Sequence, residues 1–232
     1  MPPTPLSPTT LSMTHPDLGS QLINLCSMML LLTAFAIVAQ RRLSACVDLY
    51  ALQSLFLAVT AALVAWFTDS PHIYIAALLT LVIKTVTIPI ILKKVIERVN
   101  VKREVEFVVN IPPSLLICGA LVILAFSVTE PIARLGFLLT RDSLAIALAI
   151  VLIGFFMMIA RRKAVSQIVG FLMMENGLFL GATASAYGMP LIVELGVFFD
   201  VLVAGLIVGV YAHRLQDTFD SVDTTKLTGL KE

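Results

Sequence analysis

The sequence has few charged residues for its length. Asp, Glu, Lys and Arg make up 13% of the 232 residues, whereas hydrophobic residues make up 59%. A soluble globular domain carries about 25% charged residues. A single core cannot bury this much apolar surface, so the composition predicts that lipid surrounds most of the chain. The formal net charge of +1 argues against a nucleic acid as partner.

The sequence also lacks the motifs of independent catalysis. It contains no CxxC pair, Walker loop, GxGxxG, HExxH or GxSxG motif. The three histidines show no metal-ligand spacing, and the three cysteines fall in or beside apolar runs, where we expect small buried side chains. We therefore expect no cofactor and no metal ion in this chain.

The first 19 residues contain no lysine or arginine and are rich in proline, serine and threonine. A secretory signal begins with a basic region, which is missing here. We interpret residues 1–19 as a disordered N-terminal tail.

Seven apolar segments are long enough to cross a bilayer, which needs about 20 residues per helix. The sequence therefore predicts an all-α integral membrane protein with seven transmembrane helices. In the third segment, Pro89 is predicted to loosen the helix about one turn after Lys84. The seven segments are 21–39, 44–67, 72–92, 113–128, 144–160, 164–186 and 191–212.

Basic residues follow the odd-numbered segments. The tail and the loops at Asp69 and Gly188, on the opposite side, contain no lysine or arginine, and only the loop with Arg134 and Arg141 departs from this pattern. The positive-inside rule then predicts an external N-terminus and a cytoplasmic C-terminus. The basic residues that decide the orientation are Arg41, Arg42, Lys93, Lys94, Arg98, Lys102, Arg103, Arg161, Arg162, Lys163 and Arg214.

Two parts of the chain, each starting at a pair of arginines, resemble each other. Their alignment places Gln53 opposite Glu175 and Lys84 opposite Asp200. It predicts parallel three-helix units, as found in some transporters; chance similarity between apolar segments is the alternative. The predicted divisions are a first unit at 20–110, a connecting helix in 111–140, a second unit at 141–215 and a cytoplasmic tail at 216–232.

Three charged residues fall near the middle of predicted helices: Lys84, Glu175 and Asp200. A charge there costs roughly 2.5–3.5 kcal/mol on insertion scales, so such residues usually face protein or water and often belong to an ion path. An apolar site drives an isolated carboxylate towards its protonated form, and a nearby ammonium opposes this. We predict that Glu175 and Asp200 are proton-relay groups tuned by Lys84. The alternative is static helix packing.

Four further polar residues accompany these charges. Glu194, near the outer end of its helix, is predicted to line the exit of the relay or to sit at the membrane interface. Gln53, Gln167 and Asn176 can hold water or bridge helices by hydrogen bonds. We expect these three to support the polar axis, with a purely structural role as the alternative.

The C-terminal part resembles the small K-type subunit of bacterial complex I and the C subunit of multisubunit cation/proton antiporters. The residues that carry this resemblance are the Arg161-Arg162 pair, Glu175, Asp200 and the basic end His213-Arg214, in this order. The resemblance implies a three-helix unit with two carboxylates on neighbouring helices.

Most of the chain resembles the membrane component E family of hydrogenase-4. The resemblance is carried by residues 167–180, which include Glu175-Asn176-Gly177, by residues 193–203 and by the helix of Lys84. It implies a non-catalytic subunit of a complex I-like assembly in the bacterial or archaeal plasma membrane, beside antiporter-like subunits. Ni–Fe and iron–sulfur centres would belong to partner subunits. The alternatives are a structural scaffold, a subunit of a multisubunit antiporter and a stand-alone small-solute transporter.

Overall fold

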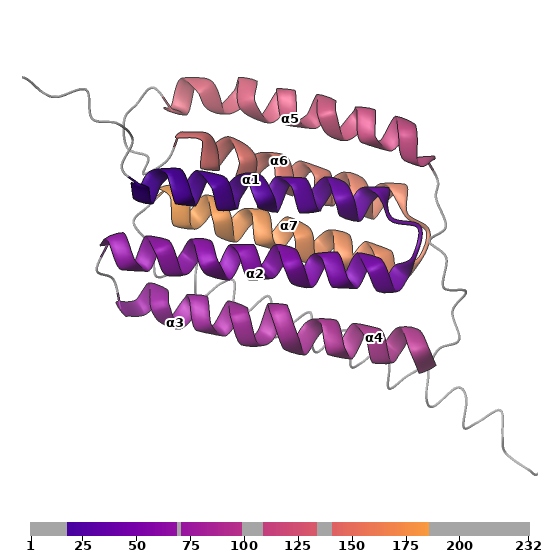
Figure 1. Cartoon of the computed structure of the whole chain (residues 1–232). Helices are drawn as coiled ribbons and strands as arrows, with labels where there is room; N and C mark the ends of the chain where they lie inside the picture. The colour runs from indigo at the N-terminus through magenta and orange to yellow at the C-terminus, as the bar shows by residue number, and fades with distance from the viewer. Residues whose placement is uncertain (1–17, 69–70, 99–108, 134–140, 186–232) are drawn as a thin grey trace, which may run out of the picture.

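A computed structural model describes residues 18–68, 71–98, 109–133 and 141–185, and nearly all of these residues are helical. The helices lie roughly side by side along one direction (Figure 1). In chain order they are α1 (Leu18–Ala39), α2 (Leu43–Thr68), α3 (Pro71–Thr80), the π-helix η1 (Leu81–Thr87), α4 (Ile88–Arg98), α5 (Ile111–Ala133), α6 (Arg141–Ala160) and α7 (Ala164–Ser185).

The described residues contain six spans that are long and apolar enough to cross a membrane. Because α3, η1 and α4 follow one another without a break, they form a single span, Ile73–Glu97. The six spans coincide with the first six predicted segments, although the third runs further, to Arg98, and α5 is longer than predicted at both ends. The described part of the chain is therefore helical, and its six spans are those of a multi-pass membrane protein. The seventh predicted segment, 191–212, lies outside the described residues.

The spans form two hairpins that lie side by side. The hairpin α1–α2 packs on the hairpin α6–α7 through the pairs α1–α6 and α2–α7, while α3, η1 and α4 cover α2, and α5 covers α6 and α1 (Figure 1). Helices α1 and α6 run in the same direction. Ser27 Oγ, in the first half of α1, lies 3.1 Å from Ser143 Oγ at the start of α6. Arg161, after α6, donates to the carbonyl of Val38 near the end of α1.

Glycines allow α6 and α7 to approach closely. A Cβ atom added at Gly154 would lie 2.8 Å from the carbonyl oxygen of Gly170 and 2.8 Å from the backbone nitrogen of Met174. Backbone atoms cannot swing aside as a side chain can. The α6–α7 contact therefore depends on the missing side chain at Gly154, and α7 is held at a defined distance from its neighbours.

Replacing Gly154 with alanine is expected to lower the stability of the bundle by about 1–3 kcal/mol, because the new methyl group overpacks the α6–α7 interface. Gly119, on α5, is the matched control, since a Cβ there meets no atom within 4 Å. Gly119→Ala should be neutral or slightly stabilising because alanine favours helix. Thermal unfolding of the purified protein in detergent compares the two variants, and equal melting temperatures would contradict the packing argument.

The third span contains wide π-helical turns where the sequence predicts a loosened helix. The N–H of Ile88 bonds to the carbonyl of Ile83, five residues earlier. The hydroxyl of Thr87 likewise donates to the carbonyl of Val82, at 2.9 Å. Pro89 follows directly and has no N–H to donate. Such turns inside α-helices occur often at functional sites.

The π-helical turns also decide which side chains face the bundle. The residues buried through the middle of this span include Thr80, Lys84, Ile88 and Leu92, which are spaced four apart. On a regular α-helix three steps of four residues would rotate the face by about 120°. The wider turns offset that rotation, so Lys84 remains on the buried face with its neighbours.

Candidate functional site

Lys84 and Glu175 form an ion pair inside the bundle. Lys84 Nζ, from η1, lies 3.2 Å from Glu175 Oε1, from α7, and the two side chains are 1% and 5% exposed. Both residues stand near the middle of their spans, Ile73–Glu97 and Ala164–Thr183. The structure thus brings together two of the predicted relay residues, at the depth where a charge costs most.

Among the described residues, the helices α1, α2 and α6 place no other charge near the middle of the bundle. Helix α1 contains no charged residue, and those of α2 and α6 stand at the helix ends. The free-energy cost of removing two charges from water is offset only when the charges pair closely and make further hydrogen bonds. Lys84 Nζ also lies 6.0 Å from the centre of the Phe179 ring, at the outer limit of a cation–π contact.

An amide network joins this pair to α2 and α1. Lys84 Nζ donates to Asn176 Oδ1 at 3.4 Å. Asn176 Nδ2 donates to Gln53 Oε1 and to Ser54 Oγ, each at 3.2 Å. Gln53 Nε2 then donates to the carbonyl of Leu30 at 3.1 Å. The side chains of Gln53, Ser54 and Asn176 are fully buried.

The other predicted site residues do not reach this network. Gln167 is exposed, and its Nε2 donates to the carbonyl of Arg161 at 2.9 Å, at the start of α7. Glu194 and Asp200 lie outside the described residues. Ser54 was not predicted; the signal for it was its place next to Gln53 on the buried side of α2.

Arg161 marks one end of the bundle. Its side chain is buried at the end of α6 and donates to the carbonyl of Val38 in the last turn of α1. Burial lowers the pKa of this guanidinium below its usual value. A cation at a helix C-terminus interacts favourably with the helix dipole, which offsets part of that cost. Arg162 is exposed.

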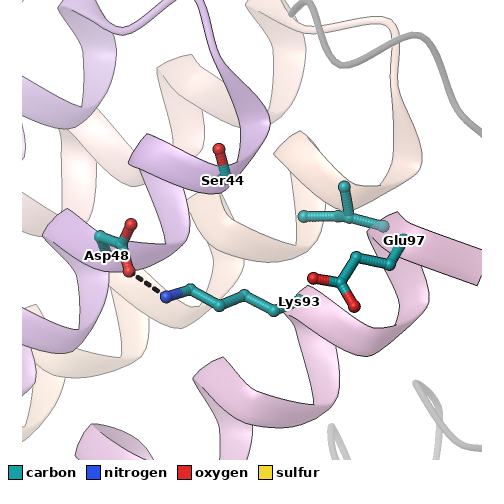
Figure 2. A pocket seen from close by; sticks show the side chains of 5 residues that line it. Ser44, Asp48, Lys93 and Glu97 are labelled. Atoms are coloured by element: carbon teal, nitrogen blue, oxygen red, sulfur yellow. Dashed lines mark ion pairs between the residues drawn. The ribbon is translucent and has the colours of Figure 1, made fainter.

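A shallow cavity of about 270 Å³ lies at the same end, between the start of α2 and the end of α4 (Figure 2). It is lined by Ser44, Asp48, Lys93, Ile96 and Glu97. Lys93 pairs with Asp48, but both side chains are largely exposed, and such pairs contribute roughly 0–1 kcal/mol. Lys93 stands nine residues after Lys84, about 13 Å along a helix, so the cavity is separate from the mid-span pair.

Within the described ranges, no group of three His, Cys, Asp or Glu side chains could hold a metal ion. The arrangement of charges and amides at mid-span offers proton exchange and hydrogen bonding. It offers no nucleophile activated by a base among the residues described.

Comparison with known proteins finds relatives that match along almost the whole chain. The uncharacterized protein Rv0085 of Mycobacterium tuberculosis (strain ATCC 25618 / H37Rv) is 37% identical over 205 residues, which cover 88% of this chain and 93% of that protein. Hydrogenase-4 component E of Escherichia coli (strain K12) is 24% identical over 215 residues, which cover 92% of this chain and 99% of that protein. Its counterpart in Shigella flexneri matches equally well. No protein-family model and no solved structure matches.

Proposed function

Because this chain belongs to the same family as the mycobacterial protein Rv0085 and is distantly related to hydrogenase-4 component E, we propose that it is a membrane subunit of a hydrogenase-type complex. The relationship to component E supports this proposal because it extends over 92% of this chain and 99% of that relative. The six apolar spans agree with such a place in the membrane.

We propose further that the subunit carries protons through the pair of Lys84 and Glu175. The observation that carries this proposal is the buried ion pair at mid-span. While the ammonium stays close, Glu175 is held as a carboxylate. When the two groups separate, a carboxylate in an apolar site favours its protonated form. Small movements of η1 relative to α7 would therefore let Glu175 take up a proton and release it again.

The remaining parts of the proposal concern residues outside the described ranges, the orientation and division of the chain, and its partners. Asp200 and Glu194 would continue the relay, and residues 191–212 would form the seventh span, with the N-terminus outside and the C-terminus in the cytoplasm. Residues 20–110 and 141–215 would form parallel three-helix units. Antiporter-like subunits would lie beside this one in the bacterial or archaeal plasma membrane, and Ni–Fe and iron–sulfur centres would belong to other subunits.

A scaffold is the second candidate function, and one observation favours it. The hydrogen bonds from Lys84 through Asn176 and Gln53 to the carbonyl of Leu30 tie together η1, α7, α2 and α1. A network of this kind can serve to hold a bundle rigid between larger subunits. The scaffold needs no proton on Glu175, and this separates the two candidates experimentally.

Affinity purification of the tagged chain from native membranes, in a mild detergent, tests whether it is a subunit. We expect hydrogenase-type and antiporter-like subunits to co-purify with it in fixed ratios, because a subunit is held by large, specific interfaces. A tagged membrane protein of unrelated family, expressed at the same level, is the control. A stable monomer with its own transport activity would contradict the proposal and favour a stand-alone transporter.

A further inference from the structure

The amide groups at mid-span have only one arrangement that satisfies their hydrogen bonds. A backbone carbonyl can only accept, so the carbonyl of Leu30 requires that Gln53 turn its Nε2 towards it. Gln53 Oε1 then faces Asn176 and requires its Nδ2. The Oδ1 atom of Asn176 is thereby turned to Lys84, whose ammonium can only donate.

Lys84 therefore has acceptors of two different kinds on adjacent residues of α7. Glu175 Oε1, at 3.2 Å, is charged and can take up a proton. Asn176 Oδ1, at 3.4 Å, is neutral and cannot. If Glu175 becomes protonated, its attraction for the ammonium falls sharply, and the long hydrogen bond from the ammonium to Asn176 Oδ1 can then shorten. A buried ammonium that loses its partner is strongly destabilised, so a neutral acceptor in place lowers the cost of protonating Glu175.

We propose that Asn176 is a positioning residue, held by Gln53 and Ser54, that holds the Lys84 ammonium when this group moves away from Glu175 and Glu175 takes up a proton. This inference rests on the function proposed above, and it assigns to the amide network a part in regulating the proton affinity of Glu175. Asn176 itself carries no proton. It acts through the lysine, and the orientation of its amide is set by α2.

The elements packed against α7 and the third span have their other charged residues near the helix ends, as far as the structure describes them. Of the elements packed against α7, α6 has no charged residue between Asp142 and Arg161, and α2 has none after Asp48. The other titratable side chains of α2, Cys46 and Tyr50, are buried in its first half. Helices α3 and α4 have charged or titratable side chains only towards the two ends of their span.

Difference infrared spectroscopy of the whole assembly in membranes tests this inference. The carbonyl band of protonated carboxylic acids is followed against pH and assigned to Glu175 by its absence in Glu175→Gln. In Asn176→Ala the midpoint of this band should shift by about one pH unit towards acid, a tenfold lower proton affinity. Ser54→Ala, which removes one of the two bonds that orient the amide, should shift it in the same direction by less.

Thr183→Val is the matched control, because Thr183 is buried on α7 and its hydroxyl donates only to the carbonyls of Phe179 and Leu180 in its own helix. Its midpoint should equal that of the wild type. An unshifted midpoint in Asn176→Ala, or an equal shift in Thr183→Val, overturns the role of Asn176 and leaves the proposed relay standing. If Asn176→Ala fails to accumulate, Ser54→Ala decides in the same way. A wild type without a titrating Glu175 band overturns the proposed relay as well.

Discussion

Glu175→Gln is expected to lower proton translocation per catalytic turnover at least tenfold while leaving the assembly intact. Glutamine has nearly the shape of glutamate, and its amide oxygen can still accept a hydrogen bond from Lys84, so packing between η1 and α7 is preserved. It cannot take up and release a proton. The assembly is reconstituted in vesicles, and acidification is followed with a pH-sensitive dye and normalised to the redox reaction.

Glu97→Gln is the control for this variant. Glu97 is an exposed carboxylate that lines the cavity at the end of α4, far from mid-span. Its loss should leave translocation per turnover unchanged. Translocation in Glu175→Gln at the wild-type level, with assembly intact, would refute the relay and leave the scaffold as the better account.

Lys84→Met is expected to lower the stability of the protein by about 3 kcal/mol or more, because it leaves the Glu175 carboxyl buried without its ammonium. The double variant Lys84→Met with Glu175→Gln removes both charges and should recover most of that loss. It should still fail to translocate protons. Thermal unfolding of the purified chain in detergent gives the stability, and the amount of assembled complex gives a second readout.

The comparison is a double-mutant cycle on the pair at 3.2 Å. Residues in direct contact show interaction energies of about 0.5–3 kcal/mol, whereas independent residues show additive effects. Additive losses in the double variant would mean that Lys84 and Glu175 do not stabilise each other, and the gate proposed for them would lose its physical basis.

The spans of this protein can be predicted from its sequence because they are long, apolar and bounded by charged or polar residues. The two charged residues of the pair are also visible in the sequence, since a lysine and a glutamate in the middle of apolar runs have no ordinary explanation. Their pairing is harder to predict. It depends on which helices are neighbours, and helices that are apolar almost all round carry little information about the direction they face.

The extent of the π-helix and the hydrogen bonds of the amide network cannot be predicted from the sequence. Pro89 indicates a loosened helix, but the extent of the wide turns depends on packing around Thr80 and Lys84. Gln167 and Asn176 are equivalent candidates in the sequence, yet Gln167 stands eight residues before Glu175, about 12 Å along the helix, and contacts the carbonyl of Arg161. The acceptor for Gln53 is a backbone carbonyl, which has no signature in any sequence.

An experimental density map of the complete assembly, at a resolution that shows ordered water, tests the central claim most directly. The account predicts a file of water molecules that reaches the carboxyl group of Glu175 from at least one side of the membrane, next to Lys84. A Glu175 carboxyl that is dry, bound to fixed partners in every state of the assembly and separated from all water would contradict it.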